Sequence, residues 1–391
     1  MTPDYSLILN PKVTEIKPSG IRKFFDIAAT MKNVISLGVG EPDFQTPWSV
    51  RKAGITSLER GRTKYTSNSG LMELRSAICG YTQRQIGVSY DPAAETLISV
   101  GGSEAIDAAI RAVVSHGDEV IIPQPSYVCY EPITVLAGGT PVIIETKAED
   151  SFKLTKKQLL DAITDKTKAL ILPFPCNPTG AIMEKEDLEE IAQVLSDKNI
   201  LVISDEIYSA LTFGGKKHVS IASIEGMKER TVVVSGFSKT FSMTGWRLGY
   251  ALGPAPIIKQ MTKIHQFAIM CAPTTSQYAA IEALNNCDDA VESMLREYDR
   301  RRKLMVGTFN EMGLTCKNPR GAFYAFPDIR SSGLSSDEFC ERLLKEKQVA
   351  LVPGTAFGKG GEGFVRASYC YSAEHIIEAL RRTKEFLDEL K

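Results

Sequence analysis

The sequence predicts an α/β fold in which a mostly parallel sheet is covered by helices on both faces. Short β-branched runs, each bounded by Gly, Pro, Asn or Asp, alternate with segments whose apolar residues recur every three or four positions. The strand-like runs are apolar almost throughout, which is typical of strands that are buried on both sides. The alternation and the continuous apolar runs together indicate repeated strand–helix–strand units.

The strand-like runs fall in the first two thirds of the chain. They are ETLISVGG (95–102), DEVIIP (118–123), TPVIIET (140–146), KALILPFP (168–175), NILVISDE (199–206) and RTVVVSG (230–236). Between them, SEAIDAAIRAVVS (103–115) and EKEDLEEIAQVLSDK (184–198) have the spacing of amphipathic helices.

The composition changes after about residue 285. A charged helical pattern, ESMLREYDRRRKLMVGTFNEMG, precedes short strand-like pieces (AFYAF, QVALVP, GFVRASY) and a closing helix. Because 391 residues exceed what one core usually serves, we expect a large domain over 45–285 and a smaller α+β domain formed by 1–44 with 286–391. We interpret the run REYDRRRK (296–303) as a solvated helix face.

Charge and cysteine content limit the classes of partner. The 46 basic and 47 acidic residues leave a net charge of -1, which gives no field to attract nucleic acid or an anionic membrane. The eight cysteines form no CxxC pair and are interpreted as reduced packing residues. No apolar run approaches the roughly 20 residues that span a bilayer, and the first residues lack the order of a signal peptide. We expect a cytoplasmic protein that binds a small metabolite and no metal.

Polar residues follow several of the predicted strands. In parallel sheets, ligands bind beyond the carboxyl ends of the strands. Gly101, Gly102, Ser103 and Glu104 open a helix there, and such a start is either a phosphate seat or an ordinary cap. We interpret Glu104 as a first-turn residue only. Asn177, in Asn-Pro-Thr-Gly, is either a ligand-binding residue or the start of a turn.

Two further strand ends carry charged groups. Asp205 and Tyr208 follow NILVIS, and a carboxylate at this place needs a cation or several donors to stay ionised. Lys239 and Arg247 lie in the Ser/Gly/Thr-rich turn after TVVV. Lysine amines form Schiff bases with carbonyls, and pyridoxal phosphate is the cofactor that uses this chemistry most.

One aromatic aldehyde phosphate with a basic ring nitrogen accounts for all of these groups. Lys239 would hold its aldehyde and Asp205 its ring nitrogen. Asn177 and Tyr208 would contact its ring hydroxyl. Arg247 and the helix start at Gly102–Ser103 would bind its phosphate.

The segment GFSKTFSMTGWRLG resembles the lysine signature of the class I/II aminotransferases, the fold-type-I pyridoxal-phosphate enzymes. The resemblance extends from Ile35 to about Ser372. The further matching blocks are ISLGVGEPDFQTP, KYTSNSGLMELRSAI, GGSEA, PSYVCY, PCNPTG, SDEIY, PGTAFG and GFVRASY, in family order and spacing. The resemblance implies the seven-stranded, mostly parallel sheet of that fold and a smaller second domain.

The resemblance also implies a role for individual residues at the cofactor. Lys239 would carry the cofactor as an imine, and Tyr127 would stack on its ring. The residues implied around the phosphate are Gly102, Ser103, Ser238 and Arg247. Many relatives have a phosphate-binding serine where this chain has Gly236, so we expect that contact at Ser235 or Ser238.

Three more residues are implied at the substrate and at a subunit boundary. Arg366 would grip the substrate α-carboxylate, a bidentate task for which lysine is poorly suited. Gly40 and Asn177 would lie beside the same carboxylate. Tyr65 is similar to the tyrosine that reaches the phosphate of the neighbouring subunit, which implies a homodimer with shared sites.

The implied activity is ping-pong transfer of an amino group from an L-amino acid to a 2-oxo acid, with Lys239 as the base. We expect an aromatic donor and 2-oxoglutarate as acceptor. The stretch IHQFAIMCAPTTSQ lacks the arginine of animal-type aspartate enzymes, and Ser103 stands where bacterial aspartate enzymes place a lysine. An apolar entry segment around Ile21 also fits an aromatic donor.

Several alternatives stay open or are set aside. Aspartate and N-acetyl-diaminopimelate are alternative donors, and a β-lyase of the same fold would keep every cofactor residue. A dinucleotide dehydrogenase has only the GVG of LGVGEP in its favour, without a third glycine. A transcription regulator of this fold is disfavoured because the family motifs begin near residue 35 and no basic module is present.

Overall fold

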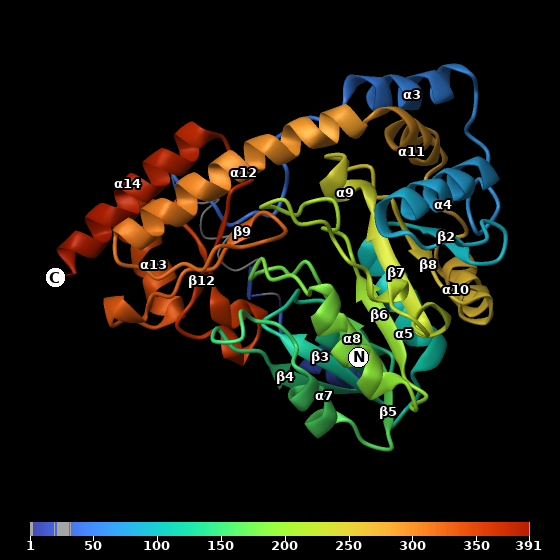
Figure 1. The fold of residues 1–391 in the computed structure, drawn as a ribbon, viewed down its shortest axis with the longest axis horizontal. Helices are drawn as coiled ribbons and strands as arrows, with labels where there is room; N and C mark the ends of the chain where they lie inside the picture. Colours follow the sequence, from blue (N-terminus) through green and yellow to red (C-terminus); the bar gives the residue numbers. More distant parts are fainter. Residues whose placement is uncertain (1–2, 19, 22–30, 32, 391) are drawn as a thin grey trace.

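The structure is a computed structural model that describes residues 3–18, 20–21, 31 and 33–390. The apolar entry segment expected around Ile21 continues into residues 22–30, which lie outside the described residues. Figure 1 shows the sheet and the helices that surround it.

A seven-stranded sheet forms the centre of the fold, with the order β2-β8-β7-β6-β5-β3-β4. Its strands are β2 (Thr96–Ser99), β3 (Glu119–Gln124), β4 (Thr140–Glu145), β5 (Thr167–Leu172), β6 (Leu201–Asp205), β7 (Thr231–Gly236) and β8 (Gly249–Leu252). Strands β3 to β7 pair in parallel, whereas β8 is antiparallel to both of its neighbours. The predicted α/β fold with a mostly parallel seven-stranded sheet is confirmed. Each of the six predicted runs contains one strand of this sheet, and the seventh strand, β8, was not predicted.

Helices cover both faces because successive strand residues point to opposite sides. Ile122, Ile171 and Ile203 pack with α5 (Gly102–Val113) and α10 (Ala255–Ala268). Their neighbours Ile121 and Leu170 pack with α8 (Lys185–Leu195) on the opposite face. The other helices of this part are α3 (Trp48–Glu59), α4 (Met72–Ile86), α6 (Tyr130–Leu136), α7 (Lys156–Ala162), α9 (Phe237–Thr240) and α11 (Thr274–Asn286).

The C-terminal part carries a second, smaller sheet in the order β11-β12-β9. Its strands are β9 (Tyr324–Ala325), β11 (Val352–Pro353) and β12 (Val365–Ser368), and all pairings are antiparallel. The helices here are α12 (Asp288–Glu311), α13 (Ser336–Lys347) and α14 (Ala373–Glu389). Helices α12 and α14 lie side by side (Figure 1).

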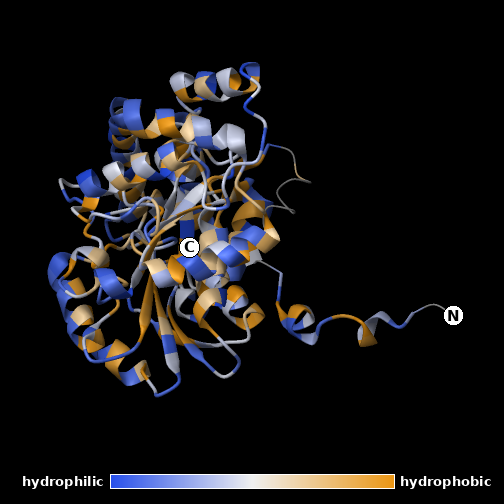
Figure 2. Cartoon of the chain, turned by 90° about the vertical axis from the view of Figure 1, so that its right-hand side faces the viewer, coloured by the Kyte–Doolittle hydropathy of each residue, from blue (hydrophilic) through white to orange (hydrophobic). Residues whose placement is uncertain are grey.

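The N-terminal segment joins this C-terminal part. Strand β1 (Ile35–Ser36) pairs in parallel with β10 (Val349–Ala350). Earlier in the chain, α1 (Pro11–Glu15) contacts α6, and residues 3–10 before it reach away from the body of the protein (Figure 2). The domain limits at 45 and 285 remain a prediction, because strand pairing alone does not delimit a domain.

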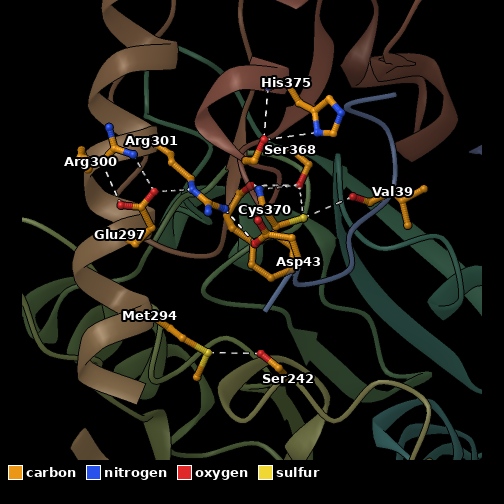
Figure 3. Close-up of polar contacts among 12 residues, drawn as sticks. Val39, Asp43, Ser242, Met294, Glu297, Arg300, Arg301, Ser368, Cys370 and His375 are labelled. Carbon is orange, nitrogen blue, oxygen red and sulfur yellow. Dashed lines mark hydrogen bonds and ion pairs between the residues drawn. The ribbon is translucent and has the colours of Figure 1, made fainter. Parts of the chain in front are cut away.

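The charged run on α12 is not a solvated face throughout. Arg301 and Arg302 are only 6% and 3% exposed. Arg301 donates 2.8 Å hydrogen bonds to Asp43 and to Glu297, as Figure 3 shows, and Arg302 pairs with Asp299. The prediction of a solvated face is wrong here because these carboxylates provide the partners that a buried guanidinium needs.

Three general features bear on the class of protein. No helix within the described residues is long and apolar enough to cross a membrane. All eight cysteines are free. In the described part of the chain, no group of three or more His, Cys, Asp or Glu side chains could hold a metal ion.

Candidate active site

A cavity of about 420 Å³ opens at the carboxyl ends of β5, β6 and β7. This is the edge at which a parallel sheet binds its ligands. The residues predicted from the sequence that line it are Gly40, Gly102, Ser103, Tyr127, Asn177, Asp205, Tyr208, Ser238, Lys239, Arg247 and Arg366. The fold therefore brings together all predicted site residues except Tyr65.

Lys239 follows β7 on the short helix α9. Its Nζ donates a 2.6 Å hydrogen bond to the carbonyl oxygen of Gly40, a residue 199 positions earlier in the chain. Burial lowers the pKa of the Lys239 amine to about 8. A substantial fraction of this amine is therefore neutral near physiological pH, as a nucleophile or a base requires.

Asp205 ends β6 and is buried at the floor of the cavity. Its Oδ2 accepts a 2.8 Å hydrogen bond from the hydroxyl of Tyr130, and its Oδ1 accepts one of 3.2 Å from the Ile207 N–H. Burial raises the pKa of this carboxyl group. No ion pair links Asp205 to a basic side chain among the described residues, so a cationic ligand group would relieve the cost of burying its charge.

Arg366, on β12, is buried and lines the same cavity. Its Nη1 donates a 2.8 Å hydrogen bond to Asn177 Oδ1, and its Nη2 donates to the Gly38 carbonyl oxygen. Its Nε is buried and has no partner among the described residues. A buried N–H that lacks an acceptor favours the arrival of an anionic group such as a carboxylate.

The helix start at Gly101 and Gly102 lies against Arg247. Gly101 has a φ of +86°, and a Cβ atom there would lie 2.6 Å from Arg247 Nη2. Gly249 is similarly close, since its Cβ would lie 2.7 Å from the Gly102 nitrogen. Only glycines admit this approach of backbone N–H groups and guanidinium, which together form a concave anion seat.

Gly236, which stands where many relatives have a phosphate-binding serine, is closely surrounded by other backbone atoms. A Cβ atom at Gly236 would lie 3.1 Å from Gly249 Cα and 3.1 Å from the Leu248 carbonyl oxygen. Of the two serines considered for the phosphate contact, Ser238 lines the cavity, whereas Ser235 donates a hydrogen bond to the Glu206 carbonyl oxygen. This arrangement favours Ser238.

Two aromatic residues predicted from the sequence lie in different surroundings. Tyr127 lines the cavity and meets Tyr130 edge to face, with ring centroids 5.9 Å apart. Tyr65 is 83% exposed and is not among the lining residues. Within one chain, Tyr65 therefore does not contribute to this cavity.

Sequence reasoning missed two tyrosines. Tyr130 lies three positions after Tyr127 in PSYVCY, and this one-turn spacing could have indicated it. Tyr324 lies in AFYAF, where nothing in the sequence separates it from core residues. Its hydroxyl is 2.9 Å from the hydroxyl of Tyr208.

The fold, with a buried lysine amine and a buried carboxylate lining one cavity, is that of a fold-type-I enzyme. The family described as aminotransferase class I and II matches residues 32–382. The chain belongs to this family. Its members depend on pyridoxal phosphate and transfer amino groups, so this chain is a pyridoxal-phosphate-dependent aminotransferase of amino acids and 2-oxo acids.

Individual relatives are similar over nearly the whole chain. A Bacillus subtilis protein, YugH, whose name gives an aminotransferase without a substrate, is 53% identical and covers 97% of this chain and 98% of its own. An aspartate aminotransferase of Pyrococcus abyssi is 48% identical and covers 98% and 100%. The solved aromatic aminotransferase of Pyrococcus horikoshii has a TM-score of 0.90 at 47% identity, and the match covers 94% of this chain and 99% of that one.

The residues present fit pyridoxal phosphate. The cavity offers a buried amine with a lowered pKa, a buried carboxylate without a cation and an anion seat that a Cβ atom would fill. These are the groups that an aldehyde, a basic ring nitrogen and a phosphate require.

Proposed function

We propose that this aminotransferase takes its amino group from an aromatic L-amino acid and passes it to 2-oxoglutarate. The observation that carries the proposal is the set of cations on the cavity wall. Among the described residues they are Lys239, Arg247 and Arg366, and each is needed for the cofactor or the α-carboxylate. No further lining cation in the described part of the chain is left for a distal carboxylate, which disfavours aspartate as the donor, whereas Ile21, Tyr127 and Val128 offer apolar surface. The distal carboxylate of 2-oxoglutarate has no lining cation of its own among the described residues either, so the choice of this acceptor rests on the resemblance to the family alone.

The proposed roles follow from where each group lies. Asp205 holds the ring nitrogen, Tyr208 and Asn177 contact the ring hydroxyl, and Tyr127 stacks on the ring. The phosphate contacts are assigned to Gly102, Ser103, Ser238 and Arg247. Arg366 grips the α-carboxylate beside Asn177 and Gly40, and its partnerless Nε supports this role.

Pyridoxal phosphate, when bound, supplies an aldehyde that condenses with amines and a protonated ring that accepts electrons. Lys239 Nζ takes the proton from the substrate α-carbon and returns it during each half-reaction. The lowered pKa of Lys239, about 8, supports this use because the amine is readily deprotonated. Asp205 is buried beside no cation among the described residues, and it would stabilise a positive charge on the ring nitrogen. One oxo acid leaves before the second enters, so the kinetics are ping-pong.

We also propose a cytoplasmic homodimer in which Tyr65 completes the partner's site. The support is the exposure of the Tyr65 side chain (83%) and of two other large apolar side chains, Phe267 (87%) and Met270 (47%). The free cysteines support a reducing compartment. Mixing Lys239→Ala subunits with Tyr65→Ala subunits tests the shared site, because only a hybrid dimer with a cross-subunit Tyr65 regains one intact site. Activity no higher than that of the unmixed variants would contradict the proposal.

A donor screen tests the substrate. The loaded enzyme is mixed with 2-oxoglutarate and with phenylalanine, tyrosine, aspartate or N-acetyl-diaminopimelate, and glutamate is measured. The proposal predicts glutamate with phenylalanine and tyrosine. Reaction with aspartate or the acetylated diamine alone would replace the aromatic donor by that alternative. Release of ammonia or a thiol without glutamate would identify a β-lyase.

A further inference from the structure

Tyr324 has a ring and a hydroxyl that contact different functional groups of the cavity. It lies on β9, is 1% exposed and lines the cavity. No role was predicted for it from the sequence. Its ring contacts Arg366, and its hydroxyl lies close to Tyr208 and to the backbone at Gly40.

The ring of Tyr324 lies against Arg366. The guanidinium carbon is 4.4 Å from the centroid of the Tyr324 ring and 4.7 Å from that of Phe357. A guanidinium over aromatic faces is held by a cation–π interaction, which is stronger when the group is desolvated. The hydrogen bonds to Asn177 and Gly38 restrain the two Nη atoms and leave only Nε without a partner among the described residues. Because the guanidinium is planar and rigid, the two hydrogen bonds and the aromatic surfaces against which it packs together set the orientation of this N–H.

The hydroxyl of Tyr324 lies 2.9 Å from the hydroxyl of Tyr208. The two rings meet edge to face, with centroids 5.9 Å apart. A phenol donates one proton and accepts others. When Tyr324 donates to Tyr208, the proton of Tyr208 is free for a ligand oxygen in the cavity, and the acceptance of a hydrogen bond makes Tyr208 a better donor.

The same hydroxyl lies close to the backbone that accepts a hydrogen bond from Lys239. A Cβ atom at Gly40 would lie 1.9 Å from the Tyr324 hydroxyl oxygen and 3.0 Å from its Cζ. The Gly40 carbonyl oxygen in turn accepts the hydrogen bond from Lys239 Nζ. Glycine at position 40 is thus required by Tyr324, independently of any contact with a substrate.

We propose that Tyr324 is a positioning residue with two separable parts. Its ring holds the Arg366 guanidinium in the orientation that receives the substrate carboxylate. Its hydroxyl holds the Tyr208 hydroxyl so that Tyr208 donates to the ring oxygen of the cofactor. The proposal rests on the roles proposed above for Arg366 and Tyr208, and it adds a residue that links them.

The first experiment separates the ring from the hydroxyl. Tyr324→Phe keeps the ring, and Tyr324→Leu removes both parts. Loaded enzyme is titrated calorimetrically with 3-phenylpropionate, a carboxylate that lacks the reacting amine. We expect the Kd to stay within about twofold in the Phe variant and to rise about tenfold in the Leu variant.

Reference variants make the outcome decisive. Arg366→Lys shows whether the probe binds at the arginine at all. If Arg366→Lys weakens binding and Tyr324→Leu does not, the positioning role of the ring is refuted while the proposed function stands. If Arg366→Lys binds the probe like the wild type, the proposed role of Arg366 fails, and the inference fails with it. Thermal unfolding of each variant checks that it is folded.

The second experiment follows the visible absorption of the bound cofactor against pH. Loss of the Tyr324 hydroxyl makes Tyr208 a weaker donor to the ring oxygen, so the negatively charged form of that oxygen is less stabilised. We therefore expect the pH midpoint of the absorption change to rise by about half a unit to one unit in Tyr324→Phe. Tyr298→Phe is the matched control, since Tyr298 lies in the same core and its buried hydroxyl has no partner among the described residues. A midpoint in Tyr324→Phe equal to that of the control would refute the role of the hydroxyl.

Discussion

The hydroxyl of Tyr130 donates a 2.8 Å hydrogen bond to Asp205 Oδ2 at the buried floor of the cavity. Within the described residues, Asp205 has one other donor, the N–H of Ile207. A carboxylate that is buried at a cost depends on such donors to stay ionised. Tyr130 therefore stabilises the ionised form of Asp205, which in the proposed function would pair with the ring nitrogen of the cofactor.

Removal of this hydroxyl should weaken the site without unfolding the protein. In Tyr130→Phe the pKa of Asp205 rises further, because the charged form loses a donor, and we expect turnover to fall about tenfold. Steady-state kinetics and equilibrium dialysis of the cofactor provide the measurement. Tyr90→Phe is the control, since the buried Tyr90 hydroxyl lacks a partner in the described part of the chain. Equal activity of the two variants would contradict this role.

The fold could be predicted largely from the sequence, because each apolar run is long enough to indicate a strand buried on both faces. Strand β8, GYAL, escaped prediction because it contains no β-branched residue and two weak strand formers, Gly and Ala. The buried arginines of α12 also escaped, since their partner Asp43 lies 258 positions away from Arg301. Local sequence patterns do not indicate contacts between residues so far apart in the chain.

The sequence predicts those site residues that lie at the end of a strand or shortly after it. Asp205, Asn177 and Lys239 share this position, so the parallel sheet alone brings them together. Tyr324 lies on a two-residue strand of the smaller sheet and reaches the cavity only through tertiary packing. A role of Tyr65 in a neighbouring subunit stays a prediction, because its side chain is exposed and does not line the cavity that the same chain forms.

The stability of the cofactor-free protein should depend on Lys239 at alkaline pH. Burial lowers the pKa of Lys239 in the native state from the ordinary lysine value of 10.5 to about 8, so the native state binds fewer protons than the unfolded state between these values. Stability therefore rises as the pH rises through this window. Relative to Lys239→Met, we expect a gain of up to about 3 kcal/mol in the free energy of unfolding. Urea titrations at several pH values measure it, and a constant difference from pH 7 to 10.5 would contradict it.

The ion pairs of Arg301 should stabilise the junction between α12 and residues 38–44. Arg301→Ala leaves Asp43 and Glu297 without their buried partner, and we expect a loss of about 1–3 kcal/mol. Arg300→Ala is the matched control: Arg300 also pairs with Glu297, but its side chain is 61% exposed, so we expect a loss below about 0.5 kcal/mol. Denaturant unfolding compares the two. Similar losses of stability in the two variants would show that the burial of Arg301 does not strengthen its ion pairs.

Gly40→Ala should be strongly damaging because of Tyr324. The added Cβ atom would lie 1.9 Å from the Tyr324 hydroxyl oxygen, so the backbone that bonds Lys239 must shift. We expect a destabilisation of about 1–3 kcal/mol. The double variant with Tyr324→Leu removes the clash and should recover part of it, which a double-mutant cycle detects. Gly307→Ala, where nothing lies within 4 Å of the new atom, is the control. Additive losses in the cycle would refute the steric explanation.

The central claim is that the Lys239 amine holds the cofactor, and chemical fixation tests it most directly. The loaded enzyme is reduced with borohydride, digested and mapped by mass spectrometry. The account predicts one pyridoxyl group per chain, located on Lys239 in the peptide that contains GFSKTF, and none in the Lys239→Ala variant. A pyridoxyl group on another lysine, or none on the wild-type chain, would contradict the account.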